Sequence, residues 1–124
     1  MRFLVRMIDR LERRYPVDAA KVFLCGHSNG AVMAYMFAAR HPEKIAALGI
    51  VAGTIGVQDK RGKTFTIPAP KAPVPMMVFH GRADPTLPYD PPAPATQPGT
   101  FPADAAPVYQ SLGVPTSVAF WVKA

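Results

Sequence analysis

The sequence predicts an α/β fold in which a parallel sheet is flanked by helices, and two observations lead to it. Three short apolar runs, rich in residues that favour strands, span residues 21–25, 47–51 and 76–80. Strands that are apolar on both faces are typical of a parallel sheet buried between helices. In addition, residues 3–15 show helical periodicity, and residues 30–40 are apolar nearly all round, as in a helix buried against a sheet. The order helix, strand, helix, strand is that of α/β units.

The first predicted helix is amphipathic and ends near Pro16. Its charged face interleaves Asp9 and Glu12 with five arginines: Arg2, Arg6, Arg10, Arg13 and Arg14. The formal net charge of the chain is +6, which would attract it weakly to anionic surfaces. This pattern of charge is nevertheless typical of a solvated helix face, and the sequence contains no nucleic-acid-binding module. We therefore expect no nucleic-acid partner.

The segment after the second apolar run predicts a small hairpin, in which residues 56–58 and 64–67 flank a charged turn at 59–62. Fifteen of the 124 residues are proline, and most of them lie beyond this hairpin, where they exclude helix and central strand. We expect the stretch 91–102 to be a surface loop that borders an active site rather than a linker between domains. The chain then resumes with a predicted helix at 117–123, for which Pro115-Thr116 is the expected N-cap segment.

Cysteine usage and apolar patterning exclude further classes of protein. Cys25 is the single cysteine, so no disulfide can form within the chain, and no Cys/His cluster has the spacing of a zinc site. We expect neither a metal nor a cofactor. Residues 1–7 alternate arginine with apolar residues, so they form neither the apolar run of a signal peptide nor a membrane span.

Gly26-His27-Ser28-Asn29-Gly30 matches the pattern G-x-S-x-G. A predicted strand precedes it and a predicted helix follows it, which is the context that a nucleophilic serine on a sharp turn requires. The turn would expose the Ser28 hydroxyl, and the flanking glycines would let the strand and helix backbones approach each other. The N–H of Asn29, at the start of the helix, would donate to an oxyanion. A phosphate-binding turn is the alternative, but the spacings G-x-G-x-x-G and Gly-Lys-Ser/Thr are absent.

Asp84 is the candidate acid of a triad with Ser28. In α/β enzymes with this serine turn, the acid lies just beyond a later strand and the histidine follows it in the chain. Asp84 follows the predicted strand 76–80 by a short turn, and the predicted strand 47–51 would separate that strand from the strand before Ser28. Asp90, in the same loop, is the second candidate. Three other aspartates are poorly placed for this role: Asp18, Asp59 and Asp104.

The base of such a triad has no clear candidate, because all three histidines precede Asp84. We expect His27 to point away from Ser28 and to pack beneath the site. His41 would close the helix on the side away from the site. His80 would lie near the correct edge of the sheet, but we expect it to be a hydrogen-bonded structural residue. The base is therefore expected to lie outside this chain.

These motifs resemble the polyhydroxybutyrate depolymerase and feruloyl esterase group of α/β-hydrolases. The resemblance rests on Tyr15-Pro16-Val17-Asp18, Gly26 to Ala31 with Met33 and Tyr35, Val51-Ala52-Gly53, His80-Gly81, Ala83-Asp84-Pro85, Pro88-Tyr89 and Val118-Ala119-Phe120-Trp121. It implies a largely secreted or periplasmic serine esterase that acts through an acyl-enzyme. Its substrates would be polyesters, or hydroxycinnamoyl and acetyl groups on plant polysaccharide.

The same resemblance implies roles for single residues, with Ser28 as nucleophile and Asp84 as acid. Members of the group begin earlier, with strands and an oxyanion loop, and end later, with a loop that carries the catalytic histidine. Residues 1–124 are thus expected to be one incomplete α/β-hydrolase domain, which should be nearly inactive by itself and prone to pair through a bare sheet edge. Two other functions stay open: a serine peptidase on the same fold, and a non-catalytic fragment that folds or binds a partner.

Overall fold

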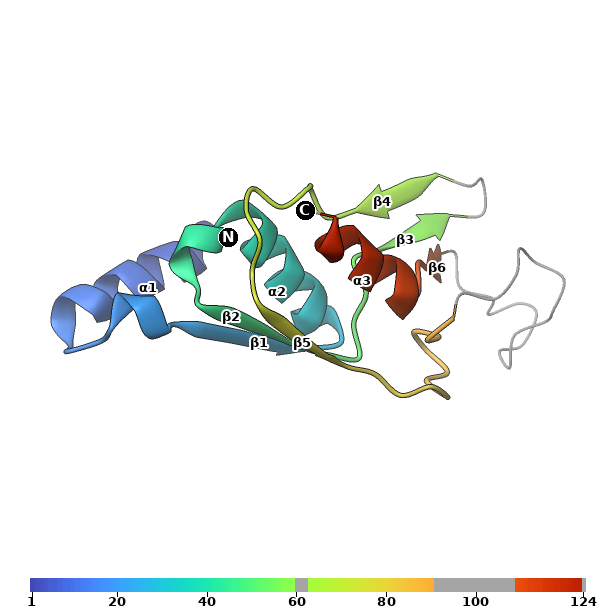
Figure 1. Ribbon diagram of the computed structural model, residues 1–124, viewed down its shortest axis with the longest axis horizontal. Coiled ribbons are helices and arrows are strands. Elements are labelled where there is room, and N and C mark those ends of the chain that lie inside the picture. The colour runs from blue at the N-terminus through green and yellow to red at the C-terminus, as the bar shows by residue number, and fades with distance from the viewer. Residues whose placement is uncertain (60–62, 91–108, 124) are drawn as a thin grey trace, which may run out of the picture.

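The computed structural model describes residues 1–59, 63–90 and 109–123. Its centre is a parallel sheet of three strands in the order β1-β2-β5, formed by Phe23–His27, Ala47–Val51 and Met76–Phe79 (Figure 1). The register pairs Cys25 with Gly49, and Gly49 with Met77. The three predicted strands and their parallel arrangement are confirmed, with β2 in the middle as expected.

The first strand begins two residues later than the predicted run, because the preceding residues form a turn. Asp18 accepts a hydrogen bond from the Ala20 N–H at 2.9 Å, and this cap starts the short 3-10 helix η1 (Ala19–Lys21). Capping by an aspartate side chain satisfies an N–H that would otherwise lack a partner at a helix start. The strand begins after this turn, at Phe23, and it extends to His27, directly before the serine.

Helix α2 (Asn29–Arg40) covers one face of this sheet. Its buried side chains pack against Leu48 and Ile50 of β2: Ala31, Ala34, Tyr35, Phe37, Ala38 and Ala39. Helix α3 (Val114–Val122) lies on the same side of the sheet, and its Trp121 stacks on Tyr35 with ring centroids 5.8 Å apart (Figure 1). The hydrophobic core thus lies between the sheet and these two helices.

Helix α1 (Arg2–Arg14) is more weakly packed than its amphipathic pattern suggests. It has no buried residue, and only its partly buried apolar side chains, such as Leu4 and Ile8, touch the core. The carboxylate of Asp9 receives a hydrogen bond from Lys44 of the 3-10 helix η2 (Pro42–Lys44) at 2.6 Å. This contact ties α1 to the start of β2.

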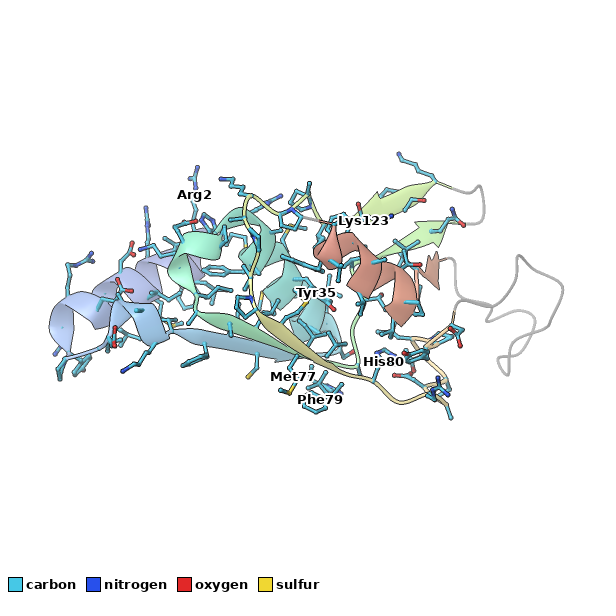
Figure 2. The ribbon with its side chains drawn as sticks, in the orientation of Figure 1. Arg2, Tyr35, Met77, Phe79, His80 and Lys123 are labelled. Carbon is cyan, nitrogen blue, oxygen red and sulfur yellow. The ribbon has the colours of Figure 1, made fainter. Side chains whose placement is uncertain are left out.

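The second face of the sheet is open, which corrects the expectation of a sheet buried on both sides. The residues Phe23, Met77 and Phe79 are 68%, 62% and 55% exposed. Figure 2 shows Met77 and Phe79 projecting from the side opposite α2. No helix of the described residues covers them. Among the described residues, helices therefore cover the apolar strands on one face of the sheet only.

A second sheet holds the predicted hairpin and one strand that the sequence did not predict. Strands β3 (Gly56–Asp59) and β4 (Thr64–Thr66) pair antiparallel, as expected. Strand β6 (Tyr109–Ser111) pairs antiparallel with the other edge of β3. It has three residues and follows a proline-rich stretch, so its sequence carries little strand signal. The predicted loop at 91–102 lies outside the described residues.

Helix α3 begins three residues before its predicted start, at Val114. Its N-cap is Gly113, whose φ of 75° lies in the left-handed region that glycine tolerates, and Pro115 occupies the first turn. Ser117, within the helix and fully buried, donates to the Gly113 carbonyl at 2.7 Å and accepts from the Ile55 N–H at 3.1 Å. Among the described residues, no helix has the length and hydropathy that crossing a bilayer requires.

Candidate active site

Ser28 stands between β1 and α2 with φ 52° and ψ −120°, which is a strained conformation for a residue other than glycine. Hydrogen bonds hold it there from both sides. Its N–H donates to the Val51 carbonyl at 2.9 Å, and its own carbonyl accepts from the N–H groups of Ala31 and Val32. Such strain costs on the order of 1–3 kcal/mol and persists where the surroundings impose it, often at active sites. The predicted strand-turn-helix context is thus present.

The two glycines of the motif differ in what they permit. A Cβ at position 26 would collide with the Gly30 carbonyl group and the Ala31 nitrogen, whereas a Cβ at position 30 would meet nothing within 4 Å. The predicted need for a glycine therefore holds at Gly26 and is wrong for Gly30. Gly53 contributes a close approach that the sequence did not predict, because a Cβ there would overlap the Ala31 Cβ.

We expect Gly26→Ala to lower the free energy of unfolding by about 3 kcal/mol, since the new methyl group must displace backbone rather than a flexible side chain. Gly30→Ala is the matched control. Its methyl group enters open space in a helix, where alanine is favoured over glycine by up to about 1 kcal/mol. Urea unfolding of both variants checks this pair. Equal stabilities would show that the backbones at the turn are not held in close contact.

Asn29 is the first residue of α2, so its N–H is among those at a helix start that lack an intrahelical partner. The dipole of the helix gives this end a partial positive charge. The geometry is suited to stabilising negative charge that develops beside Ser28. This agrees with the expected position of Asn29, and its role as an oxyanion donor stays a prediction.

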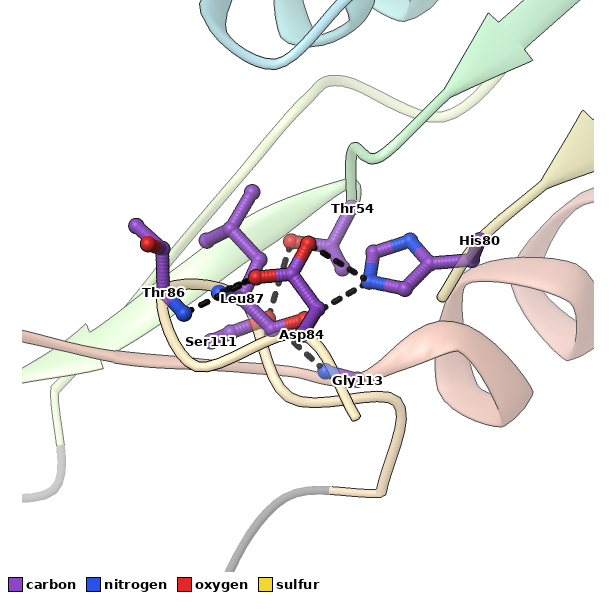
Figure 3. A network of polar contacts seen from close by, with 7 residues as sticks. All are labelled: Thr54, His80, Asp84, Thr86, Leu87, Ser111 and Gly113. Atoms are coloured by element: carbon purple, nitrogen blue, oxygen red, sulfur yellow. Dashed lines mark hydrogen bonds and ion pairs between the residues drawn. The ribbon is translucent and has the colours of Figure 1, made fainter. Parts of the chain in front are cut away.

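Asp84 lies in the loop after β5 and is held by the backbone of that loop (Figure 3). Its Oδ1 accepts hydrogen bonds from the N–H groups of Thr86 at 2.8 Å and Leu87 at 2.9 Å. These bonds, the one from Leu87 first, lower the pKa of the Asp84 carboxyl, and the nearby His80 and His27 lower it further. Asp84 is therefore an oriented, ionised carboxylate, whereas Asp90 is exposed.

The lowered pKa of Asp84 predicts an acid-sensitive contribution to stability. A carboxyl whose folded pKa is depressed stabilises the fold above its unfolded value of about 3.9, and this contribution is lost as the pH falls through the folded pKa. We expect Asp84→Asn to be less stable than the wild type at pH 7, with the gap closing below about pH 4. Thermal unfolding across pH measures it, with Asp90→Asn as control. A gap independent of pH would contradict the assignment.

His80 follows β5 directly, and its side chain is 1% exposed. Its Nε2 lies 2.6 Å from the Leu87 carbonyl oxygen and 3.6 Å from Oδ2 of Asp84. Its Nδ1 is buried without a partner among the described residues. The expectation of a hydrogen-bonded residue is confirmed, and His80 also faces the candidate acid.

His27 is exposed, so the prediction that it packs beneath the site is wrong. Side chains alternate along β1, and His27 shares the open face of the sheet with Phe23 and Cys25. Counting this alternation from Phe23 would have placed it there. His41 ends α2 away from the serine turn, as expected, with its N–H bonded to the Phe37 carbonyl at 2.8 Å.

The strand order brings Ser28 and Asp84 to one edge of the sheet. Ser28 follows β1 and Asp84 follows β5, and because the strands are parallel, both lie beyond carboxyl ends with β2 between them. Within the described residues, no histidine makes a hydrogen bond to Ser28. Residues 1–59, 63–90 and 109–123 also contain no group of three or more His, Cys, Asp or Glu side chains that could hold a metal ion.

Ala52 is a second strained residue at this edge, and no signal in the sequence predicts it. It follows β2 with φ 48°, and its N–H donates to the Phe79 carbonyl at 2.9 Å. Its neighbour Val51 accepts the hydrogen bond from Ser28. Ser28 and Ala52, which both have a positive φ, thus directly follow the adjacent strands β1 and β2 at the same edge of the sheet.

Among curated proteins, the chain is similar to "Putative esterase NocK" from Nocardia uniformis subsp. tsuyamanensis, with 33% identity over 88 residues. The match covers 71% of this chain and 24% of the relative, so the chain spans about a quarter of the relative's length. No family model matches the chain, and neither does any solved structure. That relative is described as an esterase, and membership of this chain in the polyhydroxybutyrate depolymerase and feruloyl esterase group stays a prediction.

Proposed function

We propose that this chain carries the nucleophile and the acid of a serine esterase that cleaves carboxylic esters through an acyl-enzyme. The observation that carries the proposal is the conformation of Ser28, a strained serine between strand β1 and helix α2. The ordered carboxylate of Asp84 at the same sheet edge and the esterase-like relative support it.

In the proposed reaction, a base takes the proton of the Ser28 hydroxyl as Oγ attacks the ester carbonyl carbon. The Asn29 N–H donates to the oxyanion that forms, and Asp84 orients the base and stabilises its protonated state. Collapse of the tetrahedral intermediate transfers the proton to the departing alcohol and leaves an ester on Ser28. Water then attacks this ester with the help of the same base, which releases the acid and restores the serine.

The substrate class follows from the resemblance of the motifs, and we propose either polyesters or acyl groups esterified to polysaccharide. The esterase-like relative agrees with an ester substrate in general. A serine peptidase would use the same residues on an amide bond. A secreted or periplasmic location belongs to the same resemblance and is part of this proposal.

The test supplies the base from solution. Because no described histidine is bonded to Ser28, added imidazole should accept its proton and raise nitrophenol release from short nitrophenyl esters. Ser28→Ala, assayed under identical conditions, corrects for hydrolysis by imidazole alone. Mass spectrometry of quenched samples should find the acyl group on the peptide that contains Ser28.

Three results would decide between the candidates. Acylation of Ser28 that increases with imidazole supports the esterase. Cleavage of peptides without ester turnover favours the peptidase. Identical nitrophenol release by the wild type and Ser28→Ala, with no acylated peptide, would leave the non-catalytic fragment.

A further inference from the structure

The backbone of Leu87 connects the candidate acid to a buried histidine. Its N–H donates to Oδ1 of Asp84 at 2.9 Å, and its carbonyl oxygen lies 2.6 Å from Nε2 of His80 (Figure 3). A carbonyl can only accept, so Nε2 carries a hydrogen and donates it. One residue of the loop is therefore fixed at both of its polar backbone groups.

His80 is buried and, among the described residues, is hydrogen-bonded at one ring nitrogen only. Its side chain is 1% exposed, and Nδ1 has no partner among the described residues. Its Nε2 is thus committed to the Leu87 carbonyl, and His80 acts as a fixed donor to this loop.

The two oxygens of Asp84 have different surroundings as a result. Oδ1 accepts from both Thr86 and Leu87, whereas Oδ2 lies 3.6 Å from Nε2 of His80, which is beyond hydrogen-bond length. Among the described residues, Oδ2 thus keeps its capacity to accept the N–H of a catalytic base. Oδ1 holds the loop, and Oδ2 is left for the reaction.

We propose that His80 is a positioning residue for the esterase reaction, which holds Leu87 so that Asp84 presents Oδ2 to the base. The inference rests on the proposed function. Other contacts keep the same loop in place: the Tyr89 ring meets the His80 ring edge-on at 6.2 Å, and the Arg82 guanidinium lies 5.3 Å from the Tyr89 ring centre. The Tyr89 carbonyl also accepts from the Val114 N–H of α3 at 2.8 Å.

The test replaces His80 in three ways in the whole chain. His80→Gln keeps an N–H donor that reaches the place of Nε2, His80→Asn carries a shorter amide that falls short of Leu87, and His80→Leu removes the donor. His41→Leu is the control, because His41 lies at the other end of α2. NMR titration of the Asp84 carboxyl and amide exchange at Leu87 serve as readouts that need no turnover, and imidazole-supported ester turnover is measured alongside.

We expect the Leu and Asn variants to raise the pKa of Asp84 toward its ordinary value and to speed amide exchange at Leu87. Ester turnover should fall about 10- to 100-fold, the usual effect of removing a residue that orients a functional group. The Gln variant should restore the pKa and most of the turnover, and His41→Leu should change neither. If His80→Leu does not fold, His80→Asn compared with His80→Gln answers the same question.

Two results would overturn the inference. An Asp84 pKa and Leu87 exchange that stay at wild-type values in His80→Asn and His80→Leu would show that His80 does not hold the loop. Loss of turnover in His80→Gln with the Asp84 pKa unchanged would make His80 a proton-transfer group instead. Failure of the proposed function looks different, because turnover would then survive Ser28→Ala whatever the NMR result at Asp84.

Discussion

Ser28→Ala is expected to lower ester turnover by at least about 10³-fold in any catalytically active form of the protein, because the proposed acyl-enzyme forms on the Ser28 hydroxyl. The measurement is the initial rate of nitrophenyl ester hydrolysis. Thermal unfolding of the same sample shows whether the fold is kept. Activity above a tenth of the wild type, a change in barrier of only about 1.4 kcal/mol, would contradict the assignment of Ser28 as nucleophile.

Strain at the turn allows a sharper version of this experiment. Ser28→Gly relaxes the residue with φ 52°, and Ala52→Gly relaxes the neighbouring residue with φ 48°. Both should raise the stability, each by up to about 1 kcal/mol, because glycine adopts positive φ without penalty. The two variants should differ in ester turnover, because Ser28→Gly should be inactive and Ala52→Gly should stay close to the wild type. Equal activities would mean that the turn is strained for a reason other than catalysis.

The sequence predicts the central part of this fold because local and global signals agree there. The run 47–51 is apolar on both faces and becomes the middle strand, and Gly26 must be glycine because a strand and a helix meet at it. The hairpin strands at 56–59 and 64–66 are equally local, since only a few residues of the sequence separate them. Signals of this kind need no knowledge of distant residues.

Features that depend on tertiary contacts are the ones that the sequence does not predict. β6 exists because β3 offers it a free edge. α3 starts early because Gly113 adopts a positive φ there and because Ser117 links the Gly113 carbonyl to the Ile55 N–H. Alanine is not a residue type that favours positive φ, so the sequence does not predict this conformation at Ala52. An apolar run also cannot tell how many of its faces are covered, which is why the exposure of Phe23 and Met77 was unexpected.

The candidate site shows the same division. The pattern around Ser28 has a steric cause that lies within five consecutive residues, so it could be predicted from sequence. The contact between His80 and Leu87 spans a loop, and its geometry depends on how that loop folds back on the end of β5. The sequence identifies His80 as a hydrogen-bonded residue without indicating what it bonds to.

Asp84→Asn is expected to lower ester turnover by roughly 10²- to 10⁴-fold, whereas Asp90→Asn should change it less than about threefold. An amide in place of the acid loses the charge that stabilises a protonated base, and it can favour the wrong tautomer of that base. The structure supports this ranking, because Asp84 has two backbone hydrogen bonds that orient it and Asp90 is exposed. Both substitutions preserve side-chain size, so each is the control for the other.

The pH dependence adds a second criterion to this pair. Because the folded pKa of Asp84 is depressed, its carboxylate is ionised throughout the neutral range, and the acidic limb of the rate profile should belong to the base rather than to Asp84. Initial rates of nitrophenyl ester hydrolysis should show that limb at the same pH in the wild type and in Asp90→Asn. A larger loss of turnover in Asp90→Asn than in Asp84→Asn would instead assign the acid to the exposed carboxylate, and the orientation of Asp84 by Thr86 and Leu87 would then be only a feature of the loop.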